Sequence, residues 1–519
     1  MNIAGSMVGG MTGLALLALV GGLLVTTGLP AYIVLVAASV LGAAIAVLSG
    51  LAPLALLGAL PGRLVNLFES DLMQALPLFV LMGALLNRMA VVPALFKTLV
   101  WLLPAKPGSR LVSGLALGAV LGPMSGSVGA SVMALSRTVE PSLAAAGVPV
   151  ATRHAMIALA STLGVVVPPS LVLILLGDAM LSAHTIAINA TGRMDRILNT
   201  QDVMRSALVP ALLVVLASMI IAWVTANRAT GQPSLTTRPP IERPTGGEAT
   251  LALTALALVL TLLGGVATGY FYAVEAAATG AVLLFAAGLL TGRLGVARLS
   301  AMLTDVMATT GALFAPLLAA TTFTLVLRLL GTDKLIERWI AGLPGGEIAA
   351  VCVILAALAL TAFVLDAFEI IFVIVPILIP PLLMRAADAA WVSALVLLTL
   401  QLSFLIPPAG YALMMTRGVL GRGEAASTVG STAVTRALAP FLVAQVLILA
   451  LVIAQPRLVH LLDATGAQER GAPTTAPLSK EELEKRFQEM SRPSLPFGAP
   501  GALTGRALPP FNASPPRFD

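Results

Sequence analysis

Long apolar runs, separated by short polar breaks, make up most of the 519 residues of the chain. Many of these runs reach the roughly 20 residues that an α-helix needs to cross a bilayer. No ten-residue alternation of apolar and polar positions recurs, so the runs lack the pattern of transmembrane β-strands. The pattern predicts an all-α polytopic membrane protein with about 10–13 membrane elements. The runs cover 8–27, 31–60, 71–92, 95–104, 111–136, 142–183, 206–226, 251–268, 272–291, 301–330, 348–384, 389–416 and 438–462.

The composition supports a membrane protein and argues against a nucleic-acid partner and against disulfide or cysteine-based metal sites. Hydrophobic residues make up 58% of the chain and charged residues 10%, whereas soluble domains carry about 25% charged residues. The net charge of +6 does not indicate a nucleic-acid partner, because the basic surplus lies among the membrane segments and their loops, where it orients helices. The single cysteine, Cys352, excludes a disulfide framework and a CxxC metal site.

Three polar stretches interrupt or follow the apolar sequence. Residues 227–250 are rich in Pro, Gly and Thr and are predicted to form an extramembrane linker between two halves of the chain. Residues 184–205 are predicted to form a loop, with an interfacial helical turn as an alternative for part of it. Residues 463–519 contain nine prolines, which predicts a largely disordered tail. Within that tail, the charge pairs and apolar face of residues 480–490 predict one short amphipathic helix.

Each half contains a place where an apolar run turns back on itself. Within 111–136, the letters GPMSGSVGAS combine Pro123 with several glycines and predict a re-entrant hairpin whose tip carries Ser125 and Ser127. Small residues of this kind also serve close helix packing, so that interpretation stays open. Within 348–384, the acidic residues Asp366 and Glu369 are predicted to lie near the turn of a second hairpin.

Asp366 and Glu369 are the only charges in the 348–384 run. An acid left in hydrocarbon at a helix centre costs roughly 2.5–3.5 kcal/mol on insertion scales. We therefore expect both carboxylates to face a cavity, a cation or a hydrogen-bond donor. An acid/base pair of an intramembrane enzyme is an alternative use of two neighbouring carboxylates, but no histidine, lysine or metal-ligand cluster accompanies them.

Each hairpin is followed by a helix that a proline pair must break. Proline has no N–H and clashes with the preceding turn, so it frees backbone carbonyls from helical hydrogen bonds. A single such pair is more often a structural kink, but here the apolar-Pro-Pro-small pattern occurs once per half. The broken helices are 142–183, with Pro168 and Pro169, and 389–416, with Pro407 and Pro408.

This order of hairpin and then broken helix, repeated on either side of a linker, is typical of secondary transporters built from two inverted repeats, with the site near the bilayer midplane. Freed carbonyls suit a cation such as Na⁺, and the N-termini of half-helices suit an anionic group. We divide the chain into N-terminal scaffold spans (1–110), a first transport repeat (111–226), the linker (227–250), further scaffold spans (251–347) and a second transport repeat (348–462).

Over roughly residues 11–460, these segments resemble the large, DctM-like membrane subunit of a tripartite ATP-independent periplasmic (TRAP) transporter. The forms LDAFEI and SFLIPPAGYAL are most similar to the branch labelled mannitol/chloroaromatic. The matching text is LPLFVLMGALLNRM (76–89), SGSVGASVMAL (125–135), STLGVVVPPSLVLILLGD (161–178), VEAAATGA (274–281), LDAFEIIFVIVPILIP (365–380) and SFLIPPAGYALMMTRGV (403–419).

The resemblance implies a sodium-driven importer of small organic anions such as 2-oxo acids, lactate or C4-dicarboxylates. A periplasmic binding protein would deliver the substrate, a separate four-helix small subunit would accompany this chain in the bacterial inner membrane, and an elevator motion would carry the site. It implies no ATPase and no cofactor besides Na⁺ as the coupling ion. A one-component Na⁺/anion symporter and an uncoupled channel of similar design remain alternatives.

The resemblance also assigns residues to the site. One sodium ion would be held at the first hairpin tip and the first break, and a second group of ligands would come from the second hairpin and second break. The sodium-binding residues are Ser125, Gly126, Ser161, Thr162, Gly164, Asp366, Ser403 and Ile406, and the substrate-binding residues are Ser125, Ser127, Ser170, Glu369 and Ala409.

Overall fold

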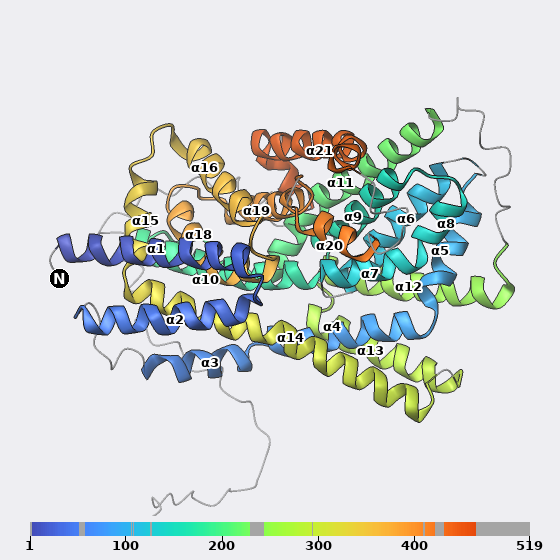
Figure 1. The fold of residues 1–519 in the computed structure, drawn as a ribbon, viewed down its shortest axis with the longest axis horizontal. Helices are drawn as coiled ribbons and strands as arrows, with labels where there is room; N and C mark the ends of the chain where they lie inside the picture. The colour runs from blue at the N-terminus through green and yellow to red at the C-terminus, as the bar shows by residue number, and fades with distance from the viewer. Residues whose placement is uncertain are drawn as a thin grey trace, which may run out of the picture. The chain divides into compact units, whose positions relative to one another are not determined.

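The computed structural model shows a chain built from helices, and no strand occurs in the part of the chain that it describes (Figure 1). The tail with its predicted helix at 480–490, most of the predicted linker, and four residues assigned to the site or its breaks, Ser125, Gly126, Pro408 and Ala409, lie outside the described residues. The described residues are 3–50, 58–104, 106, 108–124, 127–228, 243–292, 294–407, 410–420 and 430–462.

The helices of the first half begin and end where the sequence supplies the necessary residues. Gly192, for example, adopts φ +67° and ends α10 in the left-handed conformation that glycine tolerates. The elements are α1 (Ile3–Thr27), α2 (Ala31–Leu48), α3 (Ala59–Glu69), α4 (Asp71–Arg88), α5 (Val91–Leu102), α6 (Gly108–Leu121), the 3₁₀ turn η2 (Gly122–Met124), α7 (Val128–Thr138), α8 (Glu140–Ala145), α9 (Val150–Val166), α10 (Leu171–Thr191) and α11 (Thr200–Arg228).

The second half starts with a strong helix signal. The Thr245 side chain accepts a hydrogen bond from the backbone of Glu248, whose carboxylate returns one to the Thr245 N–H, and this capping box begins α12. The elements are α12 (Gly246–Thr268), α13 (Ala273–Leu290), α14 (Val296–Leu329), α15 (Thr332–Ala341), α16 (Gly346–Thr361), α17 (Ala367–Glu369), the π-helical turn η4 (Ile370–Ile374), α18 (Val375–Leu383), α19 (Ala389–Ser403), α20 (Tyr411–Leu420), α21 (Ser431–Ala454) and the 3₁₀ turn η5 (Pro456–His460).

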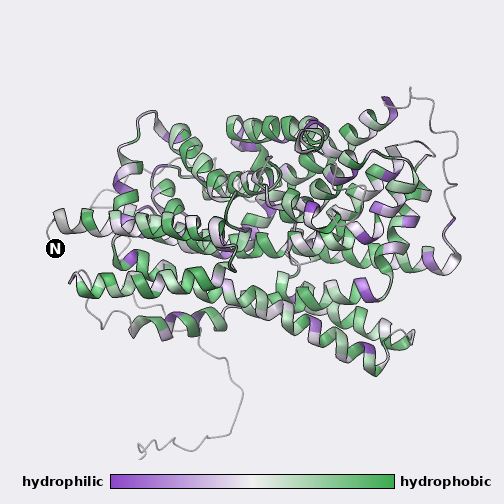
Figure 2. Ribbon diagram, viewed as in Figure 1, coloured by the Kyte–Doolittle hydropathy of each residue, from purple (hydrophilic) through white to green (hydrophobic). Residues whose placement is uncertain are grey.

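Eight of the described helices are long and apolar enough to cross a membrane alone: α1, α2, α10, α11, α12, α13, α14 and α21. Figure 2 shows that most residues along these helices are apolar and that polar residues are sparse. Shorter apolar helices, among them α9, α16 and α19, supply the arms and half-helices at the predicted hairpins and breaks. The predicted all-α polytopic fold is confirmed.

One sequence prediction about a loop was wrong. The polar stretch 184–205 does not begin as a loop, because α10 continues without interruption to Thr191. Its buried face still carries residues such as His184 and Ala187, so packing continues to hold the helix after polar side chains appear. Thr185 and Asn189 lie on the more open face of the helix.

The helix packing repeats with partners exchanged between the two halves. In chain order, α1, α2, α4, α5, α9 and α11 correspond to α12, α13, α14, α15, α19 and α21. α4 packs against α13 as α14 packs against α2; α5 packs against α12 as α15 packs against α1; and α11 packs against α19 as α21 packs against α9. Such reciprocal contacts are what two related repeats produce. Most side chains of α9 and almost all of α19 are buried, as are the first seven of α10, so these segments form the centre.

Candidate functional site

The first hairpin turns between α6 and α7 through η2, where Pro123 is buried. Ser127 has extended backbone angles and caps α7, because its Oγ accepts a hydrogen bond from the Ala130 N–H at 3.1 Å. The hydroxyl at the tip therefore has a local structural role. It also lines the cavity described below.

Two glycines allow the hairpin tip to touch α9 backbone to backbone. A Cβ on Gly164 would overlap the backbone of Gly122, and a Cβ on Gly122 would overlap Gly164 in the same way. One helical turn earlier in each helix, Gly118 lies equally close to the Ala160 carbonyl. Gly164, assigned to sodium binding from the sequence, thus holds the tip against α9, and only glycine fits there.

The first break separates α9 from α10 at the proline pair. Two hydroxyls of α9 donate hydrogen bonds within their own helix, from Ser161 to the Ala158 carbonyl at 2.7 Å and from Thr162 to the Leu159 carbonyl at 2.8 Å. The peptide bond between the two prolines is cis. Neither proline offers an N–H, so the helix ends at Val166.

Ser170 joins the two half-helices across the break. Its Oγ donates a hydrogen bond to the Val165 carbonyl at 3.0 Å and accepts one from the Leu173 N–H at 3.1 Å. The side chain is fully buried and caps α10. One hydroxyl thus fixes both the end of α9 and the start of α10.

A small, partly open cavity lies where the hairpin tip meets the first break. Four serines from three parts of the chain line it: Ser127 and Ser131 of the first hairpin, Ser161 of α9 and Ser170 at the break. All of its lining residues are uncharged. Hydroxyl and carbonyl oxygens are the ligands that hard cations prefer, so the lining matches a small alkali cation better than a transition metal.

Of these residues, Ser131 carried no role in the sequence interpretation. It stands four positions after Ser127, so it lies on the same face of α7. That spacing was the available signal. Pro123 and Gly164 also line the cavity, as does Gly122.

The second hairpin places its two acids at the start of a helix. The Asp366 carboxylate accepts a hydrogen bond from the Ala367 N–H at 2.7 Å, and the Glu369 carboxylate accepts one from the Asp366 N–H at 2.8 Å. Together they form a capping box at α17. Asp366 is half-buried and Glu369 is only 6% exposed. Donors from the helix N-terminus thus meet the need of a buried acid for hydrogen-bond partners.

The helix after this cap is locally widened. Residues 370–374 form a π-turn, an irregularity that occurs frequently at functional sites. Thr324 of α14 donates a hydrogen bond to the Phe372 carbonyl at 2.8 Å and so ties the turn to a scaffold helix.

The second break opens backbone groups between α19 and α20. Ser403 ends α19 and donates to the Thr399 carbonyl at 2.6 Å. Beyond it, the Ile406 carbonyl accepts a hydrogen bond from the Gly410 N–H at 2.9 Å and the Phe404 carbonyl accepts one from the Ala412 N–H at 3.1 Å. Each carbonyl oxygen has two lone pairs, so the Ile406 oxygen keeps capacity for another donor or a cation.

Tyr411 connects the parts of the site, although the sequence interpretation gave it no role. Its hydroxyl would lie 3.8 Å from a Cβ added to Gly129 of the first hairpin, and its ring lies 5.9 Å from that of Phe404. A tyrosine after the second break thus lies against the first hairpin.

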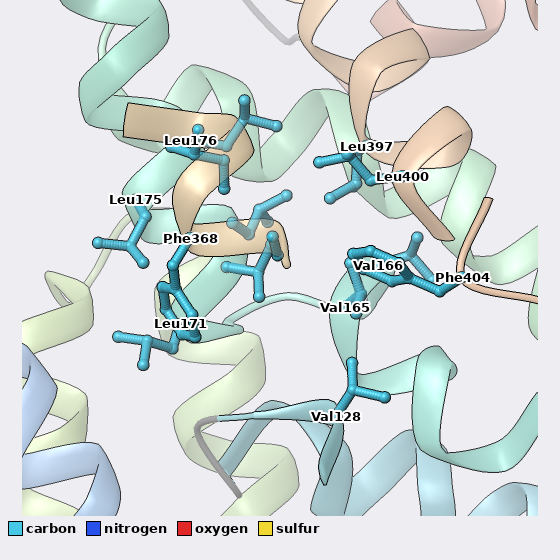
Figure 3. Close-up of a cluster of buried hydrophobic side chains, with 14 of the residues drawn as sticks. Val128, Val165, Val166, Leu171, Leu175, Leu176, Phe368, Leu397, Leu400 and Phe404 are labelled. Carbon is cyan, nitrogen blue, oxygen red and sulfur yellow. The ribbon is translucent and has the colours of Figure 1, made fainter. Parts of the chain in front are cut away.

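Apolar packing surrounds these polar groups. Figure 3 shows Phe368 of the second hairpin beside Leu171 of α10, and Phe404 beside Val165 and Val166 of α9. All of these side chains are buried. The cluster joins the two repeats around the first break. Among the described residues, no group of three or more His, Cys, Asp or Glu side chains could hold a metal ion.

Comparisons with known proteins all point to one family of transporters. Residues 16–458 match the family model described as the DctM component of tripartite ATP-independent periplasmic transporters. The C4-dicarboxylate TRAP transporter large permease protein DctM of Rhodobacter capsulatus is 25% identical over 75% of this chain and 86% of its own length. The 2,3-diketo-L-gulonate TRAP transporter large permease protein YiaN of Escherichia coli is 21% identical over 69% of this chain and 80% of its own length.

A solved structure shares the fold. The YdaH transporter of Alcanivorax borkumensis superimposes with a TM-score of 0.55, at 14% sequence identity, over 77% of this chain and 87% of that one.

Proposed function

Because the chain belongs to the family of DctM components of tripartite ATP-independent periplasmic transporters, we propose that it is the large membrane subunit of a Na⁺-coupled importer of small organic anions. The relatives named for C4-dicarboxylates and for 2,3-diketo-L-gulonate favour a carboxylate as the substrate. The motifs LDAFEI and SFLIPPAGYAL further favour the mannitol/chloroaromatic branch of the family.

The observation that carries sodium coupling is the cavity lined by four serines at the first proline break. Its lining contains no charged side chain, so a bound Na⁺ would supply the positive charge that an anionic substrate needs nearby. Ser127, Ser131, Ser161 and backbone carbonyls are the ligands proposed for this ion. In the second half, Asp366, Ser403 and the Ile406 carbonyl are the corresponding candidates.

The substrate would bind between the hairpin tips. Ser127 and Ser170 cap the N-termini of α7 and α10, whose backbone N–H groups favour negative charge. Glu369 lies at the other hairpin, where it is engaged in a capping box. Ser125 and Ala409 belong to the same two tips by sequence and complete the proposed set.

Movement of the site completes the proposed mechanism. The two hairpins and two broken helices would form one transport unit that moves against the outer helices, as in an elevator. A periplasmic binding protein would hand over the substrate, and a separate four-helix subunit would support this chain in the bacterial inner membrane. The Na⁺ gradient would drive uptake, without an ATPase.

The test is uptake of labelled C4-dicarboxylates, lactate and 2-oxo acids into proteoliposomes that contain this chain, the small subunit and the binding protein. We expect accumulation that requires an inward Na⁺ gradient and stops when the binding protein is omitted. Equal accumulation in K⁺ would refute sodium coupling. Accumulation by this chain alone would identify a one-component carrier instead.

A further inference from the structure

One face of α10 is polar along most of its length. Asp178, Ser182, Thr185 and Asn189 follow one another at intervals of four, three and four residues, so their side chains lie in one stripe of the helix. We call these four residues the polar stripe. Ser182 and Asn189 are exposed, and Asp178 and Thr185 are half-buried.

The polar stripe differs from the faces that other helices turn outward. α11 exposes Leu212, Leu216 and Ile220, and α21 exposes residues such as Val446 and Leu447, as lipid-facing helices do. α10, by contrast, exposes no large apolar side chain, and the rest of its surface is mostly buried. The exposed residues of α10 therefore do not form a surface suited to contact with lipid chains.

Asp178 is the strongest indication of what the stripe faces. Within the described residues its carboxylate makes no hydrogen bond and no ion pair, and yet it is not among the polar groups enclosed without a partner. Its oxygens therefore reach open space. An acid inside a membrane helix costs roughly 2.5–3.5 kcal/mol when it faces hydrocarbon, so water or a cation is the expected neighbour.

The polar stripe occupies only the second part of α10. Leu171 lies on the same face as Asp178, seven residues earlier, and lines the serine-lined cavity together with Ser170. Between them, Ile174 and Leu175 are apolar and buried, so they close this face toward the cavity. At 1.5 Å per residue, the stripe runs about 16 Å along the helix, from Asp178 to Asn189 near its end.

The charges at the far end are paired. Arg193, just beyond the end of α10, donates a hydrogen bond to the Leu383 carbonyl at 2.6 Å and lies 3.9 Å from Asp195. Arg196 pairs with Asp202 at 3.1 Å. Asp178 is the carboxylate of this face without such a partner among the described residues.

We propose that the polar stripe of α10 lines a water-filled path that leads cations from the end of α10 inward to Asp178, the residue that attracts them. The identity of the cation as Na⁺ rests on the proposed function, whereas the existence of the path does not. A lone carboxylate beside low-dielectric walls raises the local concentration of cations and lowers that of anions.

The test is cysteine labelling in membranes that contain the full-length chain, alone and with the small subunit. Cys352 is replaced by alanine, and single cysteines are placed at Ser182, Thr185 or Asn189. The probes are two membrane-impermeant methanethiosulfonates, one with a trimethylammonium group and one with a sulfonate group, and their rates are normalised to those of a free thiol. Controls are Val446→Cys, which is similarly exposed on α21, and Leu175→Cys, which is buried in α10.

We expect labelling at all three stripe positions at rates at least about tenfold above both controls. With Asp178 intact, the cationic probe should react about tenfold faster than the anionic probe after normalisation. Asp178→Asn should abolish this preference without abolishing labelling.

Labelling no faster than at Val446 would overturn the path, and so would protection of the stripe when the small subunit is present, because the stripe would then be a subunit contact. Labelling without charge preference would overturn the role of Asp178. These labelling rates do not depend on transport, so they test the path separately from the test of sodium-driven uptake.

Discussion

At the scale of single residues, the two acids of the second hairpin illustrate how one side chain can meet a structural need and a proposed chemical one. Asp366 caps α17 through a hydrogen bond from the backbone, and the cap requires an oxygen but no charge. Binding of a cation would require the charge. Asparagine keeps the first property and removes the second, so the two roles can be separated.

We predict that Asp366→Asn leaves folding nearly unchanged and weakens apparent Na⁺ affinity about tenfold, or ~1.4 kcal/mol. Asp366→Ala should weaken Na⁺ affinity similarly and also lose about 1 kcal/mol of stability with the cap. The measurements are the Na⁺ dependence of uptake and the melting temperature in detergent.

A matched control lies in the same repeat. Asp388 caps α19 by accepting a hydrogen bond from the Trp391 N–H at 2.9 Å, and its other carboxylate oxygen lies 2.6 Å from His460 Nε2. Asp388→Asn should leave the Na⁺ dependence unaltered. An unchanged Na⁺ dependence in Asp366→Asn would remove this carboxylate from the cation site.

At the scale of elements, the contact between the first hairpin and α9 decides whether the serine cavity exists. The hairpin tip can approach α9 only because Gly122 and Gly164 present no side chain to each other. Packing in protein interiors is dense, so one added methyl group must displace backbone there. The cavity would then change shape along with the tip.

We predict that Gly164→Ala destabilises the chain by ~1–3 kcal/mol, the usual cost of overpacking, and lowers the melting temperature accordingly. Gly264→Ala in α12 is the control, because nothing lies within 4 Å of its added Cβ. Helix propensity predicts no loss there. Equal melting temperatures for Gly164→Ala and the unaltered chain would show that the hairpin does not rest on α9 as described.

Elements of this kind were predictable from the sequence where local chemistry fixes them. The repeated apolar-Pro-Pro-small pattern located both breaks, and the glycines of the first hairpin and the two acids of the second located the hairpins. A proline pair alone was not sufficient, because Pro380 and Pro381 lie inside α18. Ser131, Tyr411 and Asp178 could not be assigned in this way, because their roles depend on which helices pack together. The expectation of a loop at 184–205 was wrong for the same reason, since burial of one face keeps α10 helical to Thr191.

At the scale of the whole molecule, the exchange of packing partners between the two halves places related breaks around a common centre. α9 packs against both α19 and α20, and α20 packs against α7, so the second break lies beside the first hairpin. Tyr411 lies at this contact, with its hydroxyl near Gly129 of the first hairpin. A cation bound in one repeat can therefore influence the other through direct contacts, which is what coupling of ion and substrate requires.

The central claim is that the serine-lined cavity binds Na⁺, and equilibrium binding of radioactive sodium to the purified chain in lipid nanodiscs tests it most directly. The account predicts saturable binding that weakens at least about tenfold in the double variant Ser131→Ala/Ser161→Ala, because two oxygen ligands are lost. Ser113→Ala should bind like the unaltered chain, since Ser113 is equally buried but lies outside the cavity. Unchanged sodium affinity in the double variant would contradict the account.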